Sequence, residues 1–141
     1  MIVGINLDSI DAKKHTAPAG NIRIDNNVNI VHVKNTKIPI FDEKISQIGF
    51  KFTTKYSKED AVIGTVTITG SVLFRGDTEQ IKKTYSEEKK LPEKIGLMVI
   101  NAILTKCITQ TIHIAEQVSL PPPISMPSVS HKKKQNLEYI G

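Results

Sequence analysis

Residues 45–74 decide the fold, and they read ISQIGFKFTTKYSKEDAVIGTVTITGSVLF. Apolar or β-prone residues alternate with polar ones over 45–56 and again over 61–74, which is typical of strands with one buried face. A short polar turn joins the two runs, so the stretch predicts an antiparallel hairpin. Gly64 and Gly70 lie on its apolar face and leave room for a bulky element, such as a helix, to cross closely.

Two more strands are expected before the hairpin. Apolar and polar residues alternate loosely over residues 2–10 and more regularly over residues 21–34. The Asn26-Asn27 step in the second segment permits a bend, or a pairing of its two halves. A polar loop containing Pro and Gly separates them. The first part of the chain is therefore predicted to form a sheet.

The periodicity changes after the hairpin. A short helix is predicted from Asp77 or Thr78 to Glu87, and a long helix from Pro92 to about Val118. The first part of the long helix is apolar almost all the way round. One sheet can cover only one side of such a helix, so we expect the remaining side to meet another copy of the chain.

A proline-rich strip follows the long helix. Residues 120–127 contain four prolines, which favour an extended conformation. The apolar side chains of the strip are expected to lie against a surface. The predicted organisation is a single domain over residues 1–129 and a polar, lysine-rich tail over residues 130–141.

Composition narrows the class of protein. The 141 residues suit one domain, no uninterrupted apolar run reaches the ~18 residues of a membrane span, and the N-terminus lacks the features of a signal peptide. Cys107 is the one cysteine, so no internal disulfide can form. We therefore expect a reduced, cytoplasmic protein without a membrane span.

The net charge of +5 suggests an anionic partner, but the residue types do not favour specific nucleic-acid binding. Only Arg23 and Arg75 are arginines, tryptophan is absent, and aromatic residues make up 5% of the chain. Base and phosphate recognition relies on guanidinium groups and on aromatic stacking. Nucleic acid is accordingly a disfavoured partner.

No catalytic or metal-binding constellation is evident. The four histidines lie in separate elements, and the single helical pair, His113 with Glu116, has no second pair to complete a site. Cys107 has apolar neighbours one helical turn away, which favours a buried structural thiol over a nucleophile. We expect no enzyme activity, no metal and no cofactor.

Two segments of the last third carry a family resemblance. Residues 106–110 read KCITQ and residues 120–129 read LPPPISMPSV. They resemble the SecB family of export chaperones and SecB-like proteins, in which a Glu-Cys-Ile-Thr-Ser helix segment is followed by Phe-Pro, a Leu-Asn-Leu stretch and Ala-Pro-Val. The order of strands before these segments also agrees.

The resemblance implies an α+β fold with a four-stranded antiparallel β-sheet, a short helix, one long helix and a Pro-rich C-terminal strip. It further implies an ATP-independent holdase, a dimer of dimers that binds unfolded or preprotein polypeptides in apolar grooves, in protein export or targeting. The groove residues would be Phe41, Phe50, Phe52, Phe74, Leu120, Ile124 and Met126. The packing or oligomer face of the long helix would comprise Ile100, Asn101, Leu104, Ile108 and Ile112.

The charge of the chain departs from the family. SecB is acidic and docks the SecA motor through its acidic surface, whereas this chain is basic, so a SecA-type partner is not expected. A role beside a toxin–antitoxin pair is an alternative within the family. Two alternatives lie outside it: a basic nucleic-acid-binding module, and a non-catalytic structural subunit that assembles through the long helix.

Overall fold

A computed structural model describes residues 1–37, 40, 44–127 and 129. Four strands precede two helices, as predicted, and the α+β class is confirmed. The predicted tail over residues 130–141 lies outside the described residues. In chain order the elements are β1 (Ile2–Lys14), β2 (Arg23–Lys37), β3 (Lys44–Lys58), β4 (Ala61–Arg75), α1 (Thr78–Glu88) and α2 (Glu93–Gln117).

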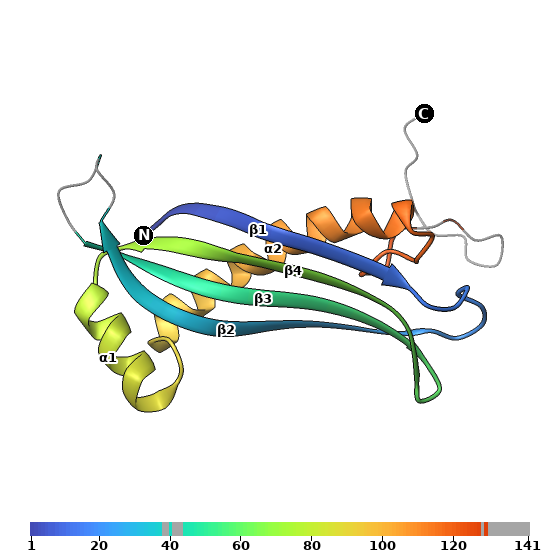
Figure 1. Ribbon diagram of the computed structural model, residues 1–141, viewed down its shortest axis with the longest axis horizontal. Helices are drawn as coiled ribbons and strands as arrows, with labels where there is room; N and C mark the ends of the chain where they lie inside the picture. The colour runs from blue at the N-terminus through green and yellow to red at the C-terminus, as the bar shows by residue number, and fades with distance from the viewer. Residues whose placement is uncertain (38–39, 41–43, 128, 130–141) are drawn as a thin grey trace.

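The strands form one antiparallel sheet in the order β1-β4-β3-β2 (Figure 1). The predicted hairpin, β3 and β4, makes its centre, with Phe52 opposite Ile68. β1 and β2 are the edge strands, so the loop between them passes from one edge to the other. The pairing of β2 with β3 continues in register through the Asn26-Asn27 step, where a bend or a pairing of the two halves was considered, and the irregularity lies between Ile30 and His32.

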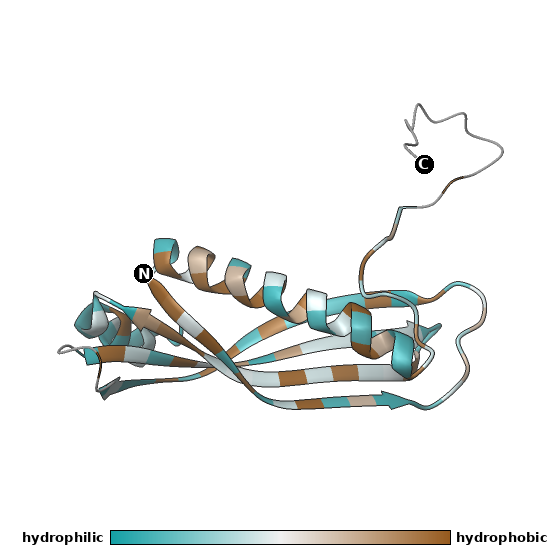
Figure 2. Ribbon diagram, turned by 90° about the horizontal axis from the view of Figure 1, so that it is seen from above, coloured by the Kyte–Doolittle hydropathy of each residue, from teal (hydrophilic) through white to brown (hydrophobic). Residues whose placement is uncertain are grey.

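The two faces of the sheet differ in polarity. The face toward α2 is built by alternate, fully buried side chains of β3 and β4, including Phe52 and Ile68. The other face presents the threonines of β4 and exposed lysines of β3, such as Lys51 and Lys55. This division follows from the two-residue period of a strand. Figure 2 shows α2 running along one side of the strongly twisted sheet.

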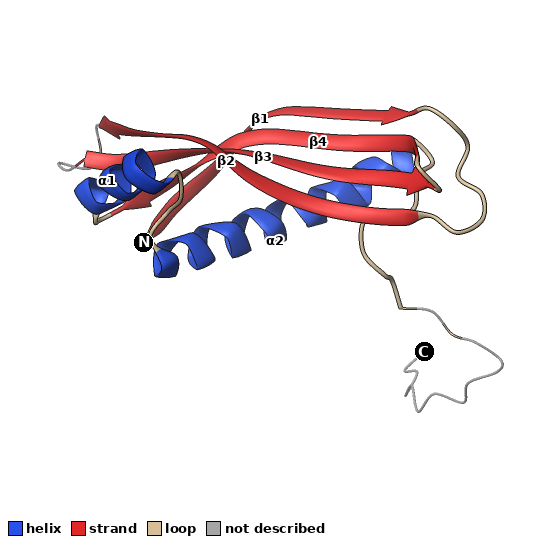
Figure 3. Ribbon diagram, turned by 90° about the horizontal axis from the view of Figure 1, so that it is seen from below, coloured by secondary structure: helices blue, strands red, loops and turns tan. Residues whose placement is uncertain are grey.

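The buried residues of α2 recur at every fourth position: Ile95, Val99, Ile103, Cys107, Thr111 and Ala115. Because an α-helix has 3.6 residues per turn, a four-residue spacing winds slowly around the helix. The buried stripe can thereby follow the twisted sheet below it (Figure 3). On the first half of α2, Leu97 is 63% exposed and Met98 is 48% exposed, so one sheet leaves part of this apolar helix uncovered.

By length and composition alone, α2 is long and apolar enough to cross a membrane. Its 25 residues include an 18-residue window of mean hydropathy 1.5, of which 28% is buried. A membrane span was excluded because no uninterrupted apolar run in the sequence is long enough. That criterion is too strict, because an apolar window that contains a few polar residues also passes the test of length and composition. Core helices of soluble proteins have similar composition, and in this structure α2 packs on the sheet.

The two glycines of β4 meet different neighbours from the helix that had been expected. A Cβ at Gly70 would overlap the main-chain carbonyl oxygen of Asn6, in the adjacent strand β1. A Cβ at Gly64 would lie 2.9 Å from the Cδ atoms of Leu120, in the proline-rich strip. Gly70 therefore leaves room for the backbone of β1, and Gly64 leaves room for Leu120 of the proline-rich strip.

Replacing Gly70 with Ala should weaken the pairing of β1 with β4. The added methyl group forces the backbone of Asn6 away, so we expect the free energy of unfolding to fall by about 2 kcal/mol or more. Urea unfolding followed by circular dichroism measures this change. Gly4→Ala is the matched control in β1, since its Cβ would lie 4.0 Å from Leu73. Equal stability of the two variants would contradict the prediction.

Candidate functional site

The strip that follows α2, residues 120–127 and here called the proline strip, turns back over the apolar face of the sheet. Ser119 has a positive φ of 59°, and the Leu120 N–H donates a 2.8 Å hydrogen bond to the Ala115 carbonyl. This geometry ends the helix and reverses the chain. Leu120 is then buried against Gly64, which fixes the start of the strip on β4.

Two side chains of the sheet hold the proline strip through its carbonyl groups. The Tyr56 hydroxyl donates to the Pro121 carbonyl at 2.6 Å, and the Asn26 Nδ2 donates to the Pro123 carbonyl at 2.9 Å. The Thr54 hydroxyl donates in turn to the Asn26 Oδ1 at 2.7 Å, which orients the amide. Proline has no N–H, so a proline main chain can be held only as an acceptor. The strip is therefore fastened to β2 and β3.

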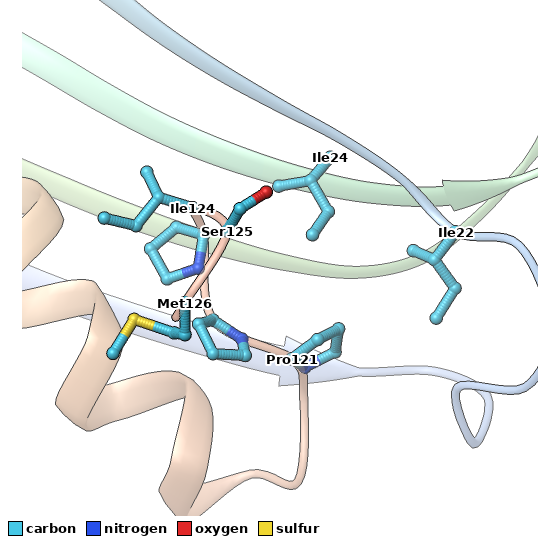
Figure 4. Close-up of a pocket in the computed structure, with 8 residues that line it drawn as sticks. Ile22, Ile24, Pro121, Ile124, Ser125 and Met126 are labelled. Carbon is cyan, nitrogen blue, oxygen red and sulfur yellow. The ribbon is translucent and has the colours of Figure 1, made fainter. Parts of the chain in front are cut away.

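A first pocket of about 570 Å³ lies between the proline strip and β2 (Figure 4). Ile24 of β2 and Ile22 just before it line the pocket on one side, and Ile124 and Met126 line it from the strip. Its lining contains no charged residue, so it favours apolar ligand groups. The complete lining is Ile22, Ile24, Pro121, Pro122, Pro123, Ile124, Ser125 and Met126.

A second pocket of about 450 Å³ lies further along β2, beside the start of α2. Apolar groups again form its walls, but Lys89, Lys90 and Glu93 bring charge to it. The second pocket thus has charged groups of both signs, which the first one lacks. The lining comprises Val28, Asn29, Ile30, Lys89, Lys90, Leu91, Glu93, Gly96, Leu97 and Ile100.

The two pockets share one strand, and we call them together the β2 groove. Ile22 and Ile24 belong to the first pocket, and Val28 and Ile30 to the second. Alternate residues of a strand point to the same side, so these four side chains lie in one row. The centres of the two pairs are six residues apart, or about 20 Å along an extended strand. The groove thus has the shape to receive an extended chain.

The buried titratable groups of the site are neutral. Burial raises the pKa of the Cys107 thiol to about 11, which outweighs the opposing effect of Lys106. Burial also raises the pKa of Tyr56 to about 12, so its hydroxyl stays protonated and can donate to Pro121. Cys107 is buried within the core, as a structural thiol would be. Among the described residues, no three His, Cys, Asp or Glu side chains are grouped to hold a metal ion.

Comparison with solved structures identifies the architecture. A SecB-like chaperone of Mycobacterium tuberculosis, solved in complex with a ChAD peptide from the HigA1 antitoxin, superposes with a TM-score of 0.59. The match covers 93% of this chain and 91% of that chain, at 15% sequence identity. The chain has a SecB-like fold. No protein-family model and no curated protein sequence matches it.

Within this SecB-like fold, most of the predicted groove residues are part of the core. Phe50, Phe52, Phe74 and Leu120 are at most 5% exposed, so the prediction that they line an open groove is wrong for the single chain. The reason is that α2 and the proline strip cover the face from which they project. Ile124 and Met126 do line the first pocket. Phe41 lies outside the described residues.

The residues predicted for the oligomer face of α2 have different surroundings in this SecB-like fold. Asn101 is exposed, whereas Leu104 and Ile108 pack partly against the core. Ile100 lines the second pocket, and Ile112 is half-buried. The sequence interpretation missed Leu97 and the apolar row that follows β2, which comprises Ile22, Ile24, Val28 and Ile30. Their alternation was visible, but only the position of β2 at the sheet edge makes them groove residues.

Burial of the Tyr56 hydroxyl should make stability depend on alkaline pH. Because folding raises this pKa from about 10 to about 12, the unfolded state ionises first, and stability should fall as the pH rises from about 10 to 12. Tyr56→Phe should cost about 1 kcal/mol at neutral pH, since a hydrogen bond is lost. It should also flatten the alkaline decline.

Chemical unfolding of both proteins at pH 8, 10 and 11.5 measures this effect. Tyr85→Phe, on the half-buried Tyr85 of α1, is the control and should keep the decline. Parallel pH profiles for the wild type and Tyr56→Phe would exclude this role of the hydroxyl.

Proposed function

We propose that this SecB-like chain is an ATP-independent holdase chaperone that binds extended segments of non-native polypeptides in the β2 groove. The observation that carries the proposal is the row of apolar side chains on β2 that opens into two pockets about 20 Å apart. Pockets of this chemistry take apolar side chains of many shapes. The first pocket offers no charged group that would select one small molecule.

The position of β2 supports a main-chain contribution to binding. As an edge strand of the sheet, β2 has one side on which its N–H and C=O groups face away from β3. An extended peptide can hydrogen-bond to such an edge while alternate side chains enter pockets. Main-chain hydrogen bonds form with almost any peptide sequence, because every residue except proline has both an N–H and a C=O group. Such binding suits a chaperone with many clients.

Such a site would act on the folding equilibrium without nucleotide hydrolysis. Extended segments with alternating apolar residues are accessible in unfolded chains and hidden in folded ones. A protein that binds only the unfolded state shifts the equilibrium toward that state by mass action. The peptide complex of the SecB-like neighbour lends further support to a polypeptide ligand.

The cellular role would be to hold preproteins for export or targeting, or to act beside a toxin–antitoxin pair, in the cytoplasm. The net charge of +5 argues against docking to a SecA-type motor through an acidic surface. A nucleic-acid-binding role receives less support from the structure, because Phe50, Phe52 and Phe74 are buried and cannot stack on bases.

We also propose that the chain assembles as a homo-oligomer, in the dimer-of-dimers form implied by the resemblance. The first half of α2 exposes Met98, which lines neither pocket, and Leu97, which lines the second pocket. Covering exposed apolar side chains with a second copy gains hydrophobic free energy at about 25 cal/mol per Å². A second copy is the simplest partner for this face, since it needs no other gene product.

The holdase proposal predicts stoichiometric suppression of client aggregation without ATP. A heat- or urea-denatured client should scatter less light when the protein is present in equal amount. The double variant Ile124→Ser/Met126→Ser should weaken client binding about tenfold, because both side chains line the first pocket. These side chains are 43% and 50% exposed, so the fold should persist.

Ile10→Ser is the matched control, since Ile10 is 47% exposed on β1 and lies outside both pockets. It should protect the client as well as the wild type does. Unchanged scattering with the wild-type protein would refute the holdase proposal. Equal losses in the two variants would place binding outside the first pocket.

The assembly proposal predicts a solution mass larger than one 15.6 kDa chain. Met98→Glu should lower the mass measured by light scattering, because burying the new carboxylate at a subunit contact is unfavourable. His113→Glu, at an exposed polar position of the same helix, should leave the mass unchanged. A monomeric wild type would contradict the proposal.

A further inference from the structure

The β2 groove is interrupted at one residue. Asn26 lies on the same side of β2 as the apolar row, between Ile24 of the first pocket and Val28 of the second. It is the polar member of an otherwise apolar series at alternate positions 22–30. Its side chain links Thr54 in β3 to Pro123 in the proline strip. The amide therefore lies between the two pockets along β2.

We propose that Asn26 is a specificity-determining residue of the β2 groove, one that selects polypeptide segments with a hydrogen-bonding side chain between two apolar clusters. This inference rests on the proposed polypeptide-binding function and adds the pattern that the ligand must carry. The groove would then accept a polar residue at its centre and apolar residues on both sides.

The hydrogen-bonding capacity of the amide supports this role. An asparagine side chain has two N–H donors and one carbonyl acceptor. The carbonyl accepts from Thr54, and one N–H donates to Pro123. Within the described part of the chain, the Pro123 carbonyl is the one acceptor that this Nδ2 group has, so a second N–H is available to a ligand. An apolar ligand side chain here would strip water from that N–H without replacing the hydrogen bond, which is unfavourable.

The spacing fixes the ligand pattern. An extended ligand lying along β2 presents alternate residues to the groove at the same rise per residue as the strand. A nine-residue segment would place five side chains opposite positions 22, 24, 26, 28 and 30. The first two and the last two enter the apolar pockets, and the central one meets Asn26. The preferred segment is therefore apolar, apolar, polar, apolar, apolar at every second residue.

Two labelled nine-residue peptides test the inference. Both carry Leu at the four outer groove-facing positions and Ser at the alternate positions, and they differ only in Gln or Leu at the centre. Fluorescence anisotropy measures their affinities. The wild type should bind the Gln-centred peptide about fivefold more tightly, the value of one hydrogen bond. Asn26→Leu, which has nearly the same shape, should prefer the Leu-centred peptide instead.

Asn27→Leu is the matched control. Asn27 is the neighbouring residue, exposed on the polar face and opposite Thr53, so its replacement should keep the wild-type preference. An affinity ratio near one for the wild type would overturn the role of Asn26, even if Asn26→Leu fails to fold. An unchanged ratio in folded Asn26→Leu would overturn it too. Failure of the wild type to bind either peptide would instead count against the proposed function itself.

Discussion

The apolar face of the β3–β4 hairpin must be covered, and the rest of the molecule is arranged around that requirement. Its buried phenylalanine and isoleucine side chains each contribute about 1.5–3 kcal/mol when removed from water. Helix α2 covers the length of this face with a stripe that winds with the sheet. The proline strip continues the cover where α2 ends, and Leu120 packs into the space above Gly64. The β2 groove is what remains open at the border of this cover.

Much of the fold follows from local patterns in the sequence. The hairpin over 45–74 and the long helix were predicted within a few residues because alternation and helical periodicity are properties of single elements. Such patterns do not predict the order of the strands in the sheet, because an alternating strand presents the same apolar face at the centre of a sheet and at its edge. The fold-level prediction came instead from the KCITQ segment and the proline strip, and the structural match supports it.

The candidate site was harder to predict than the fold. Aromatic side chains such as Phe50 and Phe52 suit a peptide groove as well as a core, and only the position of α2 decides between the two. The Asn26-Asn27 step was interpreted as one that permits a bend or a turn, whereas Asn26 lies within a continuous strand and donates a hydrogen bond to the strip 97 residues away. Contacts over such sequence distances depend on tertiary structure, so a residue's own neighbours do not reveal them.

The proline strip has one more consequence, which concerns self-assembly in an undesired form. An open sheet edge such as that of β2 is a template on which identical chains can stack into fibres. The segment that borders this edge is fastened by its carbonyls and, at each proline, lacks the N–H needed to become a fifth strand. The proline strip is therefore a poor strand partner for the edge of β2, and a poor template for a strand of another chain.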